Sequence, residues 1–292
     1  MGAWTTEPRR SSPPKGVVAV RIALAQFDPV AEPMANAEKI LELGAQARAE
    51  GARLLLAPEG SLVRFLDQPS APARAAEPLD GDFVTALRKG SAELDIAIAA
   101  GTFTPDDDTG RVHNTLAVLD RGELVTSYRK LHLYDAFSFT ESETVAPGVE
   151  PPPVIDLDGI KIGFATCYDL RFPELFRVLR MHGADVLGLA SAWVSGPGKE
   201  EHWLTLLRAR AIENTAYVVA ADQIGPHGIG RSAAFDPFGL PLLDLGMARD
   251  AVGYVDIKPE RIAEVRTVLP SSSHTRFRID PRPDLQFDPV SR

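Results

Sequence analysis

The sequence contains a single cysteine, Cys167, among its 292 residues. One thiol cannot form an internal disulfide, and without further cysteines the chain has none of the thiolate clusters that hold structural zinc. This scarcity fits a reducing compartment, so we expect a cytoplasmic protein without a metal site.

The chain also lacks long hydrophobic runs and an excess of basic residues. No stretch approaches the ~20 apolar residues that a membrane span requires. The 31 Lys and Arg against 40 Asp and Glu give a net charge of −9, which argues against nucleic acid or an anionic membrane as partner. Arg9 and Arg10 precede an apolar run as in a twin-arginine export signal, but Arg21 interrupts that run and no small-residue cleavage pattern follows. We expect a soluble protein.

The 45% of hydrophobic residues is enough for a sizeable core. Hydrophobic periodicity and turn residues predict two similar halves of alternating strands and helices, joined by hairpins, with no linker between them. We expect a disordered leader over residues 1–16, a single α/β domain over 17–269 and an extended tail over 270–292. Predicted strands are 20–27, 53–58, 96–103, 114–119, 124–128, 153–157, 160–166, 185–189, 217–221, 232–235, 242–245 and 252–257. Predicted helices are 33–50, 81–94, 173–182, 199–214 and 259–267, and residues 69–78, rich in Ala and Pro, are predicted to form a surface loop.

Cys167 lies where a buried strand, predicted over 160–166, gives way to a turn and a helix. A thiol at a helix N-terminus lies in a field that favours the thiolate, which suits a nucleophile. The alternative is a cysteine that only packs in the core, because free cysteine is among the most buried residue types.

Two further ionisable residues follow predicted strands in the same way. Glu59 ends the apolar run before it, and Lys130 ends the strand predicted over 124–128. Ligand sites of open α/β sheets lie at the carboxyl ends of strands, so a carboxylate, an ammonium and a thiol there can serve as base, electrostatic stabiliser and nucleophile. Taken singly, Glu59 could cap a turn and Lys130 could be an ordinary surface lysine.

Seven short motifs make the chain resemble the nitrilase (carbon–nitrogen hydrolase) superfamily, especially its Nit-type amidase branch. They occur in the family's order over about residues 20–267. The motifs are Ala25-Gln-Phe27, Leu56-Ala-Pro-Glu59, Tyr128-Arg-Lys-Leu-His-Leu-Tyr134, Phe139-Thr-Glu-Ser142 with Pro147-Gly148, Cys167-Tyr-Asp-Leu-Arg-Phe-Pro-Glu174, Leu207-Arg-Ala-Arg-Ala-Ile-Glu-Asn214 and Gly230-Arg-Ser-Ala-Ala-Phe-Asp-Pro-Phe-Gly239.

The resemblance implies an αββα sandwich of two packed β-sheets flanked by helices, which forms a homodimer and uses no metal or organic cofactor. It implies that Glu59, Lys130 and Cys167 are catalytic, and that Glu141 is the second glutamate that orients the site. Glu143 is the nearby competitor for that role, but the Glu-Ser pair before Pro-Gly favours Glu141.

Three residues are candidates for substrate binding. The backbone N–H of Tyr168 is placed to hold the oxyanion, and Trp193 follows a strand end and is expected to line the pocket. Arg171 either binds a substrate carboxylate or braces the turn through Glu174. Arg208, Arg210 and Glu213 share a predicted helix, and we expect them on a solvated or dimer-facing surface.

We therefore expect a thiol hydrolase that converts a small linear amide, with a dicarboxylic acid monoamide as the leading candidate, to acid and ammonia. The same residues would serve a nitrilase or an N-carbamoyl amine hydrolase. A catalytically silent homologue that acts as a binding or regulatory subunit is the alternative of another class. His132 and His202 could suggest a Cys-His protease dyad, but no protease-type residues flank Cys167.

Overall fold

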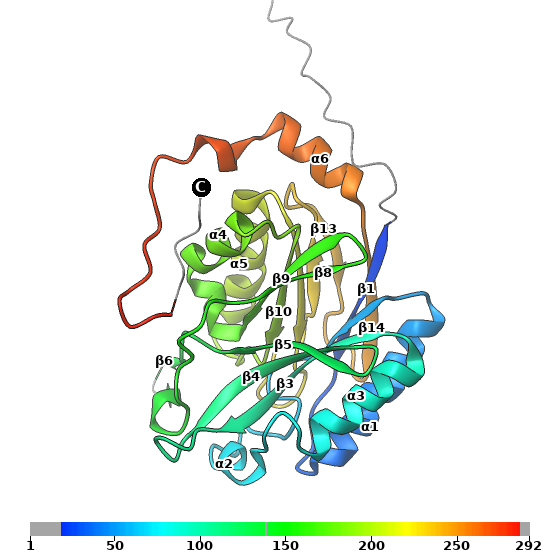
Figure 1. Cartoon of the computed structure of the whole chain (residues 1–292), viewed down its shortest axis with the longest axis vertical. Coiled ribbons are helices and arrows are strands. Elements are labelled where there is room, and N and C mark those ends of the chain that lie inside the picture. The colour runs from blue at the N-terminus through cyan, green and yellow to red at the C-terminus, as the bar shows by residue number, and fades with distance from the viewer. Residues whose placement is uncertain (1–18, 138, 287–292) are drawn as a thin grey trace, which may run out of the picture.

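The structure, a computed structural model, describes residues 19–137 and 139–286 (Figure 1). Two six-stranded sheets form its framework. The strand order is β14-β1-β2-β3-β4-β5 in the first sheet and β13-β12-β11-β10-β9-β8 in the second. The predicted leader, residues 1–16, lies outside the described residues.

The first sheet and its helices come mostly from the first half of the chain. Three helices of the protein, α1, α4 and α6, begin at a proline, whose fixed φ and missing N–H suit the first helical position. The elements are β1 Val20–Gln26, α1 Pro33–Ala49, β2 Leu54–Leu56, α2 Ala71–Ala75, α3 Asp82–Leu94, β3 Ala97–Pro105, β4 Val112–Asp120 and β5 Glu123–Arg129. The last strand of this sheet, β14 Ala251–Ile257, pairs antiparallel with β1.

The second sheet is built from the second half. Its elements are β8 Val154–Leu157, β9 Ile160–Thr166, α4 Pro173–Met181, β10 Val186–Ser191, α5 Lys199–Asn214, β11 Tyr217–Asp222, β12 Ala233–Phe235 and β13 Pro241–Asp244. The remaining short elements are β6 Asp135–Ala136, β7 Phe139–Thr140, α6 Pro259–Val268 and the 3-10 turns η1 Glu141–Glu143, η2 Cys167–Arg171 and η3 Ser271–His274.

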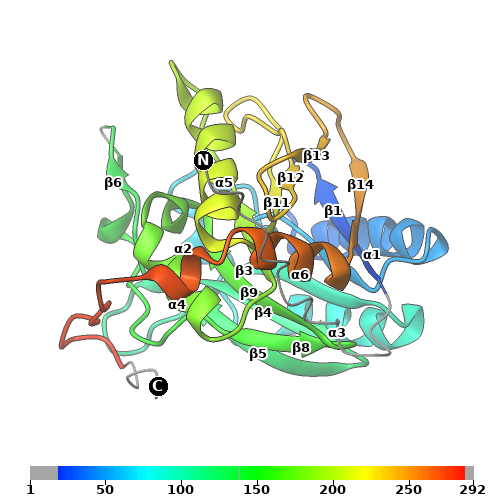
Figure 2. The ribbon, with the colours of Figure 1, turned by 90° about the horizontal axis from the view of Figure 1, so that it is seen from above.

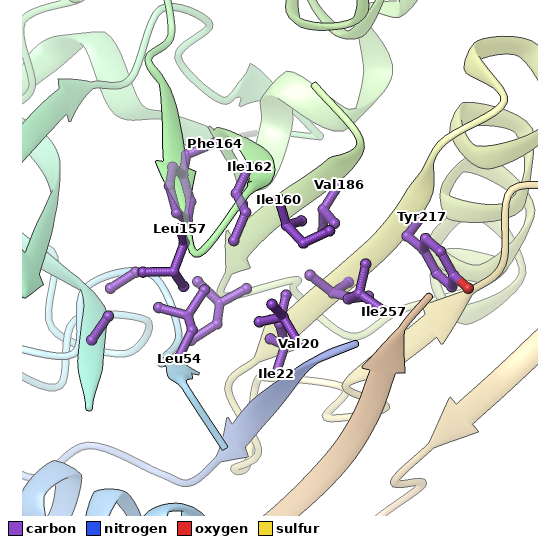
Figure 3. Packing of buried hydrophobic residues seen from close by; sticks show 14 of the residues in the cluster. Val20, Ile22, Leu54, Leu157, Ile160, Ile162, Phe164, Val186, Tyr217 and Ile257 are labelled. Carbon is purple, nitrogen blue, oxygen red and sulfur yellow. The ribbon is translucent and has the colours of Figure 1, made fainter. Parts of the chain in front are cut away.

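A hydrophobic core fills the space between the sheets (Figure 3). Successive residues of a strand point to opposite faces, so Ile22 and Leu24 of β1 enter this core. Ala23 and Ala25 of the same strand face the other way and pack in a second core. The strand is apolar throughout because both of its faces are buried.

Helices cover the outer face of each sheet (Figure 2). Ile40 of α1 and Phe83 of α3 belong to the core on the outer face of the first sheet. Phe176 of α4 and Trp203 of α5 belong to the corresponding core on the second. The four layers are those of an αββα sandwich, which confirms the predicted fold class.

Helix α6 closes one end of the sandwich, at the top of Figure 1. Its Ile262 joins the core between the sheets, and Arg266 bonds Asp185 and the carbonyl of Thr215. These two partners lie just before β10 and β11, at the amino ends of both strands. The carboxyl ends of β9, β10 and β11, which run parallel, therefore meet at the opposite end.

Residues 69–78 depart from the predicted surface loop. They contain helix α2, whose Ala71 and Pro72 are buried, because the rest of the fold covers this short apolar turn. Within residues 19–286 as described, no helix is both long and apolar enough to span a bilayer. Beyond η3, residues 275–286 form no helix or strand, and the amide of Gln286 bonds the carbonyl of Val149.

Candidate active site

The ends of three strands bring Glu59, Lys130 and Cys167 to one place. Lys130 directly follows β5 and Cys167 directly follows β9, while Glu59 lies three residues beyond β2. Lys130 Nζ lies 2.9 Å from Glu59 Oε1, and the Glu59 charge also acts on the thiol of Cys167. All three side chains are buried, so the structure joins the three predicted strand-end residues in one site.

Glu141, from η1, completes the surroundings of the Lys130 ammonium. Lys130 Nζ lies 2.9 Å from Glu141 Oε2, and the backbone N–H of Tyr134 donates to the same oxygen at 2.6 Å. Glu143 is exposed and takes no part. Of the two predicted candidates, only Glu141 reaches the lysine.

Glu59 is held by donors from both sheets. Its Oε1 accepts hydrogen bonds from Lys130 and from Asn114 Nδ2, the latter at 2.8 Å. Its Oε2 accepts the backbone N–H of Ala192 at 2.8 Å, and Gln223 Nε2 donates to its carbonyl oxygen at 2.7 Å. Donors on every side suit a carboxylate, and the bonds from Ala192 and Gln223 tie the two sheets together at the site.

Asn114 was missed by the sequence analysis. It lies within the buried strand β4 and bridges the two acids, since its Nδ2 also lies 3.2 Å from Glu141 Oε1. An amide close to the apolar run Leu116–Leu119 of the same strand is the signal that would have pointed to it, because buried polar side chains need partners.

Two glycines let the backbone approach the site closely. A Cβ on Gly101 of β3 would lie 2.7 Å from Glu59 Cα and 2.4 Å from the Gly60 nitrogen. A Cβ on Gly148 would lie 2.3 Å from the carbonyl oxygen of Arg129, next to Lys130. Both glycines are therefore needed to place the charged residues.

The charges around Lys130 keep it an ammonium ion. Burial alone would lower the pKa of Lys130, but the charges of Glu141 and Glu59 outweigh burial and raise that pKa well above its usual value.

The thiol of Cys167 behaves differently from the sequence-based expectation. Burial, followed by the negative charge of Glu59, raises the pKa of Cys167 well above its usual value, and Lys130 offsets this only in part. The resting site therefore holds a neutral thiol beside a carboxylate, where the sequence led us to expect a thiolate. The expectation counted the turn and the lysine but not the burial or the acid, which meets the thiol only in the folded chain.

The backbone at Cys167 is itself unusual. Its φ of +44° lies in the left-handed region, which residues other than glycine rarely adopt. Asp169, fully buried, holds this turn: it accepts hydrogen bonds from the amide of Thr166, the hydroxyl of Tyr128 and Nδ1 of His132. The turn that carries the thiol is thus fastened to the segment that carries Lys130.

Arg210 also supports this turn, which corrects the prediction of a surface position. Its guanidinium is buried and donates from Nε and Nη2 to the carbonyl of Leu170, and Nη1 pairs with Glu213. Arg208 of the same helix is exposed, as expected.

A cavity of about 460 Å³ opens onto Cys167. All three predicted substrate-binding residues, Tyr168, Arg171 and Trp193, line it. Its walls are largely aromatic, from Phe65, Phe103, Tyr134, Phe137, Phe139, Tyr168 and Trp193. Its size and apolar lining suit a small organic molecule.

Two cations, Arg171 and Lys199, stand on the wall of this cavity. The guanidinium of Arg171 lies 4.9 Å from the ring centre of Trp193, and Lys199 Nζ lies 3.8 Å from that of Phe137. Within the described part of the chain neither cation has a carboxylate partner, Glu174 included. Burial and the charge of Arg171 lower the pKa of Lys199. The sequence analysis placed Lys199 at the start of a predicted helix and did not assign it to the site.

No group of three or more His, Cys, Asp or Glu side chains within residues 19–137 and 139–286 is arranged to hold a metal ion.

Comparison with known proteins places the chain in a family. The carbon-nitrogen hydrolase model matches residues 21–267. The chain is 39% identical over 256 residues to a deaminated glutathione amidase of Escherichia coli O157:H7, covering 88% of this chain and 97% of that protein.

Two solved structures share its architecture. The crystal structure of Saccharomyces cerevisiae Nit3, a member of branch 10 of the nitrilase superfamily, has a TM-score of 0.80 at 28% identity and covers 91% of this chain and 100% of Nit3. A mutant of the amidase from Nesterenkonia sp. AN1, with the acetamide moiety of fluoroacetamide added covalently at its active-site cysteine, has a TM-score of 0.74 at 27% identity, with coverages of 90% and 99%. The chain is thus a carbon–nitrogen hydrolase enzyme, and it belongs to the carbon-nitrogen hydrolase family, in the Nit-type amidase branch of the nitrilase superfamily.

Proposed function

We propose that this enzyme hydrolyses a small linear amide that carries a carboxylate, giving a carboxylic acid and ammonia through a thioester on Cys167. The observation that carries the proposal is the buried network of Glu59, Lys130 and Glu141 beside the thiol, at the floor of an aromatic cavity.

Glu59 is the general base in the first step. It takes the proton of the neutral thiol as the sulfur attacks the amide carbonyl carbon, which generates the nucleophile only when substrate is present. The raised pKa of Cys167 supports this order, because a thiol of that kind requires a base beside it.

Lys130 stabilises the oxyanion that the attack creates. An ammonium group has three N–H donors, of which one faces Glu59 Oε1 and another faces the two oxygens of Glu141, at 2.9 and 3.2 Å. The third is free for the oxyanion, together with the backbone N–H of Tyr168. Glu141 has no proton to move in this scheme and acts by holding Lys130.

The remaining steps return the site to its starting state. Glu59, now protonated, gives its proton to the departing nitrogen, so that ammonia leaves and the thioester remains. Glu59 then takes a proton from water, which attacks the thioester. The carboxylic acid departs, and the proton returns from Glu59 to the sulfur of Cys167.

Arg171 and Lys199 bind the substrate carboxylate in this proposal. Lys199 is buried and Arg171 half-buried, and a bound carboxylate would give both cations the ionic partner that they lack within the described residues. A dicarboxylic acid monoamide, with its carboxylate away from the amide, suits the cavity. Deaminated glutathione, for which several relatives are named, is also an amide that carries carboxylates.

The test is a substrate panel that contains a dicarboxylic acid monoamide, its methyl ester, the matching nitrile, an N-carbamoyl amine and deaminated glutathione. We expect the monoamide to release ammonia with a kcat/KM well above that of its methyl ester. Arg171→Gln and Lys199→Met should remove this preference, by lowering kcat/KM for the monoamide toward that of the ester. Carbon dioxide release would indicate an N-carbamoyl amine hydrolase, turnover of the nitrile alone a nitrilase, and no turnover at all a silent binding homologue.

We also propose that the enzyme is a cytoplasmic homodimer. A single free thiol suits a reducing compartment. Phe238, Leu240 and Leu242, on and before the edge strand β13, are each about half exposed beside Ile212 of α5. These four residues, the β13 patch, form an apolar surface suited to a second copy of the chain.

A further inference from the structure

A second buried carboxyl group, that of Asp222, lies close to the thiol but outside the machinery described above. The parallel register pairs Thr166 with Ala190 and Ser191 with Asp222. Cys167, Ser191 and Asp222 therefore stand side by side at the carboxyl ends of β9, β10 and β11. Neither Ser191 nor Asp222 lines the cavity, and both are fully buried.

Two polar atoms of these residues have no hydrogen-bond partner within the described part of the chain. Asp222 Oδ1 accepts the backbone N–H of Trp193 at 2.7 Å, but its Oδ2 has none, and neither does Ser191 Oγ. A buried polar atom without a partner is destabilising, so such atoms call for an explanation. Here the two unpaired atoms belong to neighbouring residues on adjacent strands.

The protonation state of Asp222 supplies that explanation. Burial, and with it the nearby charge of Glu59, raises the pKa of Asp222 well above its usual value, despite the N–H of Trp193 and the hydroxyl of Ser191. Lys130, the nearest ammonium in the site, is engaged by Glu59 and Glu141. This shift favours the protonated carboxyl group, which carries an O–H that needs an acceptor.

The protonation of Asp222 determines which group donates in each hydrogen bond between Asp222, Ser191 and Cys167. A neutral Asp222 donates its proton to Ser191 Oγ, which leaves the Ser191 hydroxyl proton free to point at the sulfur. An ionised Asp222 would reverse the direction of donation. It would accept a hydrogen bond from the Ser191 hydroxyl, and an oxygen lone pair of Ser191 would then face the sulfur. Ser191 lowers the pKa of Cys167, which agrees with the first arrangement.

We propose that Asp222 and Ser191 form a hydrogen-bond relay, from Asp222 Oδ2 to Ser191 Oγ to Cys167 Sγ, that stabilises the thiolate formed during catalysis. In this relay Ser191 donates to the reacting sulfur as the thiolate forms, and Asp222 is a positioning residue that orients Ser191. The relay rests on the proposed role of Cys167 as nucleophile.

The experiment is alkylation of Cys167 by iodoacetamide across pH, followed by intact-protein mass spectrometry, which is unambiguous because the chain has one thiol. Ser191→Ala should move the midpoint of labelling upward by about one pH unit, the value of a hydrogen bond to a charged group. The same variant should lose about tenfold or more in kcat, with little change in KM.

Asp222→Asn distinguishes a neutral Asp222 that acts through the relay from an ionised Asp222 that acts through its charge. The amide can still accept from Trp193 and donate to Ser191, so we expect an unchanged midpoint. An ionised Asp222 would instead give a downward shift in this variant, since a negative charge would be lost, and that result would overturn the proposal. The double variant should match Ser191→Ala.

Ser91→Ala is the matched control, because Ser91 is a fully buried serine on α3 whose hydroxyl bonds Arg88 and Gly122 away from the site. It should leave the midpoint unchanged. A Ser191→Ala midpoint equal to that of the unsubstituted enzyme would refute the relay, and if Ser191→Ala fails to fold, Asp222→Asn alone still decides. A thiol that is inert in the unsubstituted enzyme at every pH would instead contradict the proposed nucleophile, and the two failures are therefore distinguishable.

Discussion

Lys130 bears the positive charge at the centre of the site, where two buried carboxylates hold it. Lys130→Met keeps the length of the side chain and removes the charge. We expect kcat/KM for the best amide to fall by about 100- to 1,000-fold, because an oxyanion donor is lost. Stability should also fall, by about 3–5 kcal/mol in urea unfolding, because Glu59 and Glu141 are left without their buried partner.

The control for this prediction is Lys161→Met, because Lys161 is exposed and lies on β9, the strand that precedes the thiol. Lys161→Met should change neither kcat/KM nor the stability in urea unfolding. If Lys130→Met keeps the activity of the unsubstituted enzyme, the oxyanion is not stabilised by Lys130.

Glu59 has two opposing effects on the thiol, which one substitution can separate. Its charge raises the pKa of Cys167, yet it is also the proposed base. In Glu59→Gln the charge is gone, so the midpoint of iodoacetamide labelling should move to lower pH while amide hydrolysis falls by about 100- to 10,000-fold. Lys130→Met should move that midpoint to higher pH, because Lys130 lowers the pKa of the thiol. A midpoint that rises in Glu59→Gln would contradict this account.

Sequence reasoning predicted four candidate residues that the structure brings together, Glu59, Lys130, Glu141 and Cys167, because each belongs to a motif of the family. It missed Asn114 and Lys199, and it reversed the resting state of the thiol. These features depend on side chains that meet across long stretches of chain: Asn114 and Glu59 are 55 residues apart. A local sequence pattern cannot predict contacts between residues so far apart in the chain.

Among the elements, β3 and the turn after β2 pack so closely that only glycine fits between them. Gly101→Ala would place a methyl group against the backbone of Glu59 and Gly60, where no side chain can move away. We expect a loss of about 1–3 kcal/mol in thermal or urea unfolding, and reduced kcat from a displaced Glu59.

Gly44→Ala is the matched control. On α1 the added methyl would meet Leu94 at 3.4 Å, an ordinary contact, and alanine favours the helix by up to about 1 kcal/mol. Equal effects of the two substitutions would show that the close approach at Gly101 is unimportant.

The turn η2 depends on one buried acid. Asp169→Asn replaces an acceptor by a donor where Tyr128, His132 and Thr166 all donate. We expect a loss of about 2–4 kcal/mol in urea unfolding, with Cys167 labelling faster as its turn loosens. Tyr128→Phe, which removes one of these bonds, should cost about 1 kcal/mol. If Asp169→Asn is as stable as the unsubstituted protein, the turn is held by other contacts.

Most strands and helices followed from periodicity and turn residues, with differences of at most two residues at their ends. Helix α2 did not, because Ala and Pro at residues 69–78 resemble a loop, and only in the folded chain does Ala71 join the core that contains Phe103 and that Phe65 packs against. Strands β6 and β7 have two residues each, too few for any alternating pattern to show.

At the scale of the whole molecule, the αββα arrangement was predicted through the family resemblance. Composition and periodicity gave only an α/β domain with two similar halves. How two sheets stack is decided by which faces of many strands are buried together, and no local segment of sequence determines that.

The β13 patch predicts how copies of the chain associate. Leu240→Asp with Leu242→Asp puts charge on this surface while touching no part of the site. We expect light scattering to give a dimeric mass for the unsubstituted protein and a monomeric mass for the variant, because a charge buried without a partner destabilises an interface. If the variant stays dimeric, the β13 patch is not the dimer interface.

The first sheet supplies Glu59, the proposed base, and the second supplies Cys167, the proposed nucleophile, and the bonds from Ala192 and Gln223 to Glu59 cross between them. A newly synthesised chain that has formed only its first sheet holds the acid, and one in which only the second sheet has formed holds the sulfur. Neither intermediate can cleave an amide. Hydrolytic activity therefore reports on completed folding, and the cell meets this chemistry only once both sheets have come together.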